Sequence, residues 1–146
     1  MPVDITPAEW KIMRLLWSLG PSSTTDIITE LQQQSDWTAS TIKTLLRRLC
    51  AKDLLTTTKD GRQFMYHPQV SEQLAMNDTA EALFSQLCEM HKGQVLLDLV
   101  SKSEISRADI EALQAKLAEK LPTAPEEVDC NCLPTRQQSC HEHEKE

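Results

Sequence analysis

The side chains with the clearest chemical potential lie near the C-terminal end, where three cysteines and two histidines fall within fourteen residues. They are Cys130, Cys132, Cys140, His141 and His143. Zn²⁺ prefers four tetrahedral sulfur and nitrogen ligands, whereas Cu(I) is softer and favours thiolates at low coordination number. The pattern therefore predicts a metal site with Zn(II) and Cu(I) as alternative occupants. Which histidine completes the site stays open.

These ligands belong to a tail, residues 122–146, which is rich in Pro and Glu and has few apolar residues. We expect such a segment to be poorly ordered without a ligand. Because it has no core for cysteines to fill, metal binding is the favoured interpretation. The alternative is an acidic tail that binds metal incidentally. A zinc- or cadmium-type inducer also remains open beside copper.

A second candidate site is the outward face of a helix predicted within Trp37–Leu55. Its apolar residues recur at i, i+3, i+4 and i+7, namely Ile42, Leu45, Leu46 and Leu49, which predicts one buried face. Short hydroxyls and cations cover the other face and its edges: Thr38, Ser40, Thr41, Lys43, Thr44, Arg47 and Arg48. Small polar residues can reach base edges while Lys and Arg neutralise phosphates, so this face suits a DNA major groove. Taken alone, the window favours an ordinary solvated helix face, and only the surrounding elements reverse that preference.

The elements that must position this face follow from local signals. Thr6 and Glu9 form a capping box around Pro7, and Ser23 with Asp26 begins a second helix. After Leu55 the apolar period changes to two, and Asp60-Gly61 is a hairpin signal flanked by Lys59 and Arg62. Three helices followed by a basic β-hairpin predict a winged helix-turn-helix over residues 1–69, in which Lys59 and Arg62 grip the DNA backbone.

The charge distribution supports this interpretation. The net charge of the chain is −7, which is unusual for a nucleic-acid binder. Residues 38–62, however, carry six Lys and Arg against two Asp. The positive charge is therefore concentrated where the DNA contact is predicted.

These segments resemble the bacterial repressor family that includes the penicillinase repressors and the copper-responsive CopY-type repressors. The resemblance rests on ITPAEWKIMRLLW (5–17), WTASTIKTLLRRL (37–49) and KDGRQFMYHP (59–68). It implies a winged-helix domain, a helical dimerisation domain and repression through an inverted-repeat operator. Thr41, Lys43, Thr44 and Arg48 would then lie in or beside the groove. Two departures stand out: Asp53 replaces the usual Gly, and Cys-His-x-His replaces the second Cys-x-Cys pair of the copper-responsive relatives.

Residues 70–121 show only helical patterns, and about fifty residues cannot bury three amphipathic helices well without a partner. Homodimerisation would cover their apolar stripes and match a palindromic site. Cys50 and Cys88 lie beside apolar stripes, so we interpret both as structural thiols. The predicted fold class is mainly α with a small β-hairpin.

The leading hypothesis is a metal-responsive repressor, with copper as the favoured inducer, bound to operator DNA with zinc and released by Cu(I). One alternative is a β-lactam-sensing repressor inactivated by proteolysis, although Leu97-Asp98-Leu99-Val100 lacks the Asn-Phe pair that the resemblance implies there. Another is a Cu(I) carrier or storage protein. No catalytic constellation is evident, so we do not expect an enzyme. We expect a cytoplasmic protein without a membrane segment, and a copper chaperone is a further candidate partner.

Overall fold

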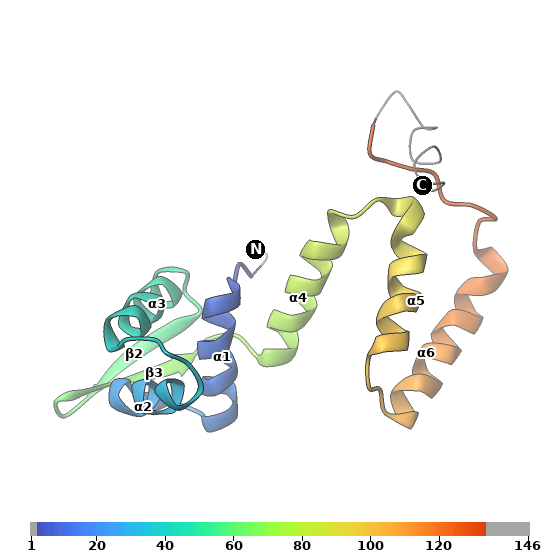
Figure 1. Cartoon of the computed structure of the whole chain (residues 1–146). Helices are drawn as coiled ribbons and strands as arrows, with labels where there is room; N and C mark the ends of the chain where they lie inside the picture. The colour runs from blue at the N-terminus through green and yellow to red at the C-terminus, as the bar shows by residue number, and fades with distance from the viewer. Residues whose placement is uncertain (1–2, 134–146) are drawn as a thin grey trace. The chain divides into compact units, whose positions relative to one another are not determined.

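The computed structural model describes residues 3–133 of the 146-residue chain. The chain divides into two compact units, Met1–Leu83 and Phe84–Glu146, called here the N-terminal and C-terminal units (Figure 1). We describe each unit separately. The described residues contain no helix that is both long and apolar enough to span a bilayer.

Three helices of the N-terminal unit begin at the predicted caps. They are α1 (Pro7–Leu19), α2 (Thr24–Gln34) and α3 (Ala39–Ala51). The hydroxyls of Thr6, Ser23 and Thr38 each accept a hydrogen bond from the backbone N–H three residues later. Each cap thereby satisfies a donor that the helix itself leaves unpaired. The capping box of Thr6 and Glu9 is confirmed.

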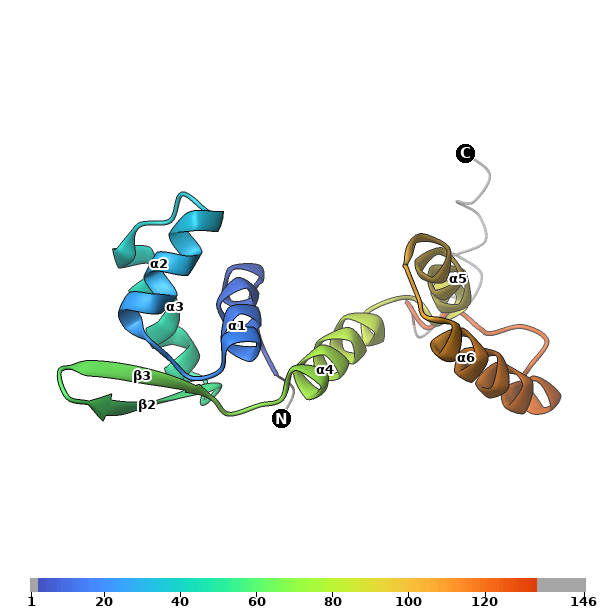
Figure 2. The ribbon, with the colours of Figure 1, turned by 90° about the horizontal axis from the view of Figure 1, so that it is seen from below.

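The predicted hairpin is present as β2 (Leu55–Asp60) and β3 (Gln63–Pro68). Gly61 in its turn has φ +64°, a conformation that glycine adopts without strain. The sheet also has a third strand, β1 (Ser22–Ser23), and the antiparallel order is β1-β3-β2. The sequence analysis missed β1 because two serines carry no strand pattern. The turn of the hairpin projects away from the helices of this unit (Figure 2).

The core of the N-terminal unit joins the apolar faces of the three helices. Its fully buried side chains include Ile12, Met13, Leu16, Ile27, Ile42, Leu46 and Leu49. The helix α4 (Glu72–Ser85) begins against this unit, since Ala75 belongs to the same core and the Trp17 indole donates to the carbonyl of Val70 at 2.9 Å. The apolar positions predicted for α3 are therefore the ones that fix its orientation.

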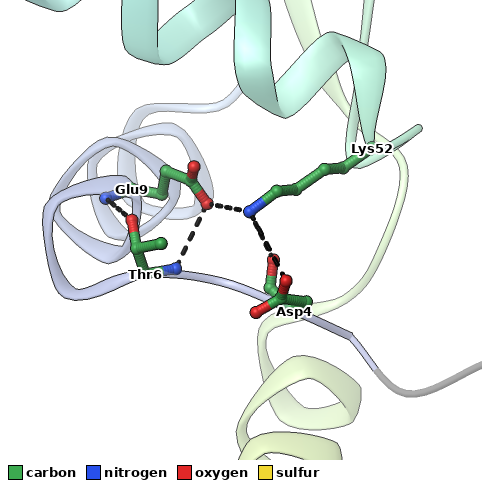
Figure 3. Close-up of polar contacts among 4 residues, drawn as sticks. All are labelled: Asp4, Thr6, Glu9 and Lys52. Carbon is green, nitrogen blue, oxygen red and sulfur yellow. Dashed lines mark hydrogen bonds and ion pairs between the residues drawn. The ribbon is translucent and has the colours of Figure 1, made fainter.

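The end of α3 is fixed in two ways. Asp53 has φ +60° directly after the helix, and the Leu54 N–H donates to the Leu49 carbonyl at 3.0 Å. This is the closing bond of a Schellman motif, in which Asp here occupies the position that Gly usually takes. Lys52 Nζ also lies 2.8 Å from Glu9 Oε2 and 2.9 Å from the Asp4 carbonyl (Figure 3). These contacts connect the end of α3 to the start of α1.

The C-terminal unit contains α5 (Lys92–Lys102) and α6 (Arg107–Lys120), with short 3₁₀ turns at Glu89–His91 and Leu121–Thr123. The two helices run in opposite directions (Figure 1). In the part of this unit that the structure describes, Cys130 is the one buried residue. The large apolar side chains of α5 and α6 are exposed, among them Leu96, Leu97, Leu99, Ile110, Leu113 and Leu117. The predicted helices are present, but a single chain leaves their apolar residues uncovered.

Candidate DNA-binding face and thiol cluster

All nine side chains predicted to contact DNA are exposed. Seven of them lie on α3 or cap it, and Lys59 and Arg62 lie at the tip of the β2–β3 hairpin. The amphipathic pattern of α3 explains this placement, because its opposite face is committed to the core.

Three of the predicted cations line one groove between α2, α3 and β3. Lys43 and Arg47 come from α3, and Arg62 comes from the hairpin turn. The groove has a volume of about 540 Å³, and Thr24, Thr25, Cys50 and Phe64 are among its other lining residues. The helix and the hairpin thus present a common cationic surface, as a winged helix requires. Lys59 and Arg48 are not among the lining residues.

The hydroxyls of α3 differ in their local bonding. Thr38 Oγ1 accepts from the Thr41 N–H and lies 3.0 Å from Thr41 Oγ1. Thr44 Oγ1 donates to the Ser40 carbonyl at 3.0 Å. Thr38 is therefore required for the start of the helix, whatever its contact with DNA. A hydroxyl both donates and accepts, so Thr41 and Thr44 retain acceptor capacity on the exposed face.

The cations of this face are not neutralised by carboxylates of the described residues. Within residues 3–133, none of the five Lys and Arg side chains of the predicted site forms an ion pair with a carboxylate. Their charge is thus directed to solvent, where it can attract phosphates. Cys50 at the edge of the groove is partly buried, and this burial raises the pKa of its thiol. A thiol that stays protonated is a poor metal ligand.

A cluster of three sulfur atoms lies in the C-terminal unit, and we call it the thiol cluster. Cys88, Cys130 and Cys132 have Sγ atoms that all lie within 4.8 Å of one another. The Cys88 thiol donates to Cys130 Sγ at 3.6 Å, and the Cys132 N–H donates to the same sulfur at 3.4 Å. Such a group can hold a thiophilic metal ion.

The thiol cluster changes the sequence-based interpretation of Cys88. We expected a structural thiol on an apolar stripe, but Cys88 lies after α4, partly exposed, beside two predicted metal ligands. No pattern of neighbouring residues could have predicted this contact, because 42 residues separate Cys88 from Cys130. Cys140, His141 and His143, the other predicted ligands, lie outside the described residues.

Comparison with known proteins identifies the family. Residues 5–119 match the penicillinase repressor family. The chain belongs to this family. It is 32% identical to the methicillin resistance regulatory protein MecI of Staphylococcus aureus over 80% of this chain and 95% of that protein. It is also 47% identical to an uncharacterized 16.5 kDa protein in the ptsI 3′ region of Latilactobacillus sakei, over 91% of each chain.

Solved structures of similar proteins include two repressors. The DNA-binding domain of the repressor BlaI is 36% identical and covers 49% of this chain and 88% of that one, with a TM-score of 0.47. The CopR repressor is 39% identical and covers 47% of this chain and all of that one, with a TM-score of 0.41. The family match ends at residue 119, so Cys130 and Cys132 lie beyond it.

Proposed function

We propose that this protein is a metal-responsive transcriptional repressor that binds an inverted-repeat operator as a homodimer. Zn(II) in the thiol site maintains the DNA-bound form, and Cu(I) replaces it and releases the operator. The observation that carries the metal response is the thiol cluster on a chain whose other unit is a cationic winged helix.

DNA binding is supported by the shared groove of α3 and the hairpin. Lys43, Arg47 and Arg62 line it, and their charges have no carboxylate partner in the described part of the chain. Phosphate contacts of this type make affinity strongly salt-dependent. A similar protein, the penicillinase repressor of Bacillus licheniformis, aligns with 80% of this chain at 28% identity.

Dimerisation is supported by the exposed apolar residues of α5 and α6. Leu96, Leu99, Ile110 and Leu113 are all more than two-fifths exposed in the single chain. Contiguous apolar surface on a soluble protein commonly marks an interface. A twofold dimer would place two α3 helices on the two halves of a palindromic operator.

The metal assignment follows from the donor set. Cys130 and Cys132 supply soft thiolate sulfur, which suits Zn(II) and Cu(I) better than hard cations. Cys140, His141 and His143 are the other candidate ligands. A bound metal ion would join the residues that ligate it. The number of residues joined would depend on whether the ion is Zn(II) or Cu(I).

The decisive experiment is a Cu(I) titration of the zinc-loaded repressor on a duplex selected from a random pool. We expect Cu(I) to release the parent chain from DNA. The combined variant Cys130→Ser with Cys132→Ser should bind the duplex more weakly, because it cannot hold zinc, and should show no further response to Cu(I). Unchanged affinity of the parent chain on adding Cu(I) would refute the metal response.

The DNA-binding face is tested separately by Arg47→Ala. This variant should weaken binding and reduce the salt slope of log K by about 1, as expected for the loss of one phosphate contact. Arg14→Ala on α1 is the matched control, because Arg14 is exposed but does not line the groove. Equal effects of the two substitutions would contradict the proposed face.

A second candidate function is a β-lactam-resistance regulator that is inactivated by proteolysis. The 32% identity to the methicillin resistance regulatory protein MecI favours it. Residues 97–100 lie within α5, where Leu97 and Leu99 are more than half exposed. This alternative requires a cut near that segment on antibiotic challenge, and induction that survives deletion of residues 122–146.

A further inference from the structure

The segment that follows α4 places a cysteine against the tail. Cys88 lies three residues after the end of α4 and is the N-cap residue of the 3₁₀ turn Glu89–His91. Its sulfur is 3.6 Å from that of Cys130, which is only 6% exposed. The other predicted ligands come from the tail alone, whereas Cys88 belongs to the helical part of the chain.

The sulfur positions suit a metal ion. With metal–sulfur bonds of about 2.3 Å, two ligands of a tetrahedral site lie about 3.8 Å apart. The observed 3.6 Å between Cys88 and Cys130 is close to that value, and Cys132 Sγ lies within 4.8 Å of both. Small side-chain rotations would therefore bring all three sulfurs to one ion.

Two further contacts hold the tail in this position. The Glu89 N–H donates to Asn131 Oδ1 at 3.1 Å, and the Cys132 N–H donates to Cys130 Sγ at 3.4 Å. The first bond anchors the residue between the two tail cysteines beside Cys88. The second is directed at a sulfur that becomes negatively charged on metal binding, and a hydrogen bond to the charged form stabilises it.

We propose that Cys88, Cys130 and Cys132 of one protomer together bind a soft metal ion, Cu(I) above all. The ion fastens the tail to the segment between α4 and α5. The proposal rests on the proposed metal response and assigns it a third ligand from outside the tail. Binding involves no redox change: each thiol forms a metal–sulfur bond and releases its proton to the buffer. Three thiolates complete a low-coordinate Cu(I) site, while Zn(II) requires a fourth ligand.

The test measures thiolate ligation directly, using Cd(II) as the probe with the full-length chain. Cys88→Ser and Cys132→Ser should each reduce the thiolate-to-Cd(II) charge-transfer absorption by the share of one ligand. Cys88→Ser should also weaken the affinity for Cu(I) by at least about tenfold. Loss of a residue that only hydrogen-bonds to a metal ligand already has an effect of that size, and Cys88 is proposed as a ligand itself. Cys50→Ser removes a thiol from the other unit and should change neither measurement. An unchanged spectrum and affinity in Cys88→Ser would overturn the proposal.

A measurement on the parent chain removes any dependence on how Cys88→Ser folds. Stoichiometric Cu(I) should protect Cys88 from alkylation by iodoacetamide together with Cys130 and Cys132, as quantified by peptide mass spectrometry. Protection of the tail cysteines with Cys88 still reactive would refute its role as a ligand. Full protection of Cys88 without release from DNA would instead refute the proposed function and leave the ligand assignment standing.

Discussion

The contact between Glu9 and Lys52 offers a sharp test of how α3 is held. Glu9 Oε2 accepts from Lys52 Nζ at 2.8 Å and from the Thr6 N–H at 3.2 Å (Figure 3). The Glu9 side chain is 1% exposed, whereas that of Lys52 is 30% exposed. Lys52→Met would leave a buried carboxylate without its cation.

The expected cost follows from this burial. Removing one partner of a fully buried ion pair destabilises a protein by about 3–5 kcal/mol. Lys52 is partly solvated and Glu9 keeps the Thr6 N–H, so we expect a loss of about 2–3 kcal/mol in the free energy of unfolding. With an m-value of about 1–3 kcal/mol/M, the urea midpoint should fall by about 0.7–3 M.

Tryptophan fluorescence is the assay of choice, because Trp10, Trp17 and Trp37 all lie in the N-terminal unit. Lys43→Met is the matched control, because Lys43 lies on the same helix and in the unit that the tryptophans report. Lys43 is exposed and forms no ion pair with a carboxylate within residues 3–133. Its loss should cost no more than about 0.5 kcal/mol.

Combining Glu9→Gln with Lys52→Met separates the effect of charge from that of packing. Gln can still accept the Thr6 N–H, so the double variant should recover most of the stability lost by Lys52→Met. A double variant as unstable as Lys52→Met alone would show that an uncompensated buried charge is not the cause.

Three further predictions concern single positions. Asp53→Gly should raise the free energy of unfolding by about 0.5–1 kcal/mol in the same urea assay. Glycine adopts the positive φ of this position without strain, and this gain outweighs the added freedom of the unfolded chain. A decrease in the free energy of unfolding would contradict this. Cys50 should react with iodoacetamide more slowly in the native chain than in urea at pH 8, because its raised pKa leaves less thiolate; equal rates would refute the effect of burial. Arg62→Ala should reduce the salt slope of operator binding by about 1, and a slope equal to that of the parent would exclude a phosphate contact from the hairpin turn.

Local signals predicted the N-terminal unit well. Thr6, Ser23 and Thr38 cap the three helices as expected, because a cap needs only residues that are neighbours in sequence. The hairpin was predicted from Asp60-Gly61, and its two turn residues lie one position later, at Gly61 and Arg62, because Asp60 pairs with Gln63. Even the unusual Asp53 could be assigned in advance, since Asp tolerates the left-handed conformation better than most residues.

What the sequence analysis missed depends on contacts between distant residues. β1 exists only because β3 offers an unpaired edge to Ser22 and Ser23. The burial of Glu9 against Lys52 brings together residues 43 positions apart. Cys88 was interpreted from its sequence neighbours as a structural thiol, and only the structure places it beside two other sulfur atoms. Residue type and spacing describe such sites only when the ligands come from one segment.

If the proposed metal site forms, Cys88 connects it to the helical part of the chain. A site formed by residues 130–143 alone would close a loop within the tail and constrain nothing else. Cys88 directly follows α4, whose first turns pack on the N-terminal unit through Ala75, and it directly precedes α5 with its exposed apolar residues. An ion held there would act on the stretch of chain between the N-terminal unit and the exposed apolar residues of α5 and α6. The operator response should therefore depend on Cys88 even where the tail cysteines are intact.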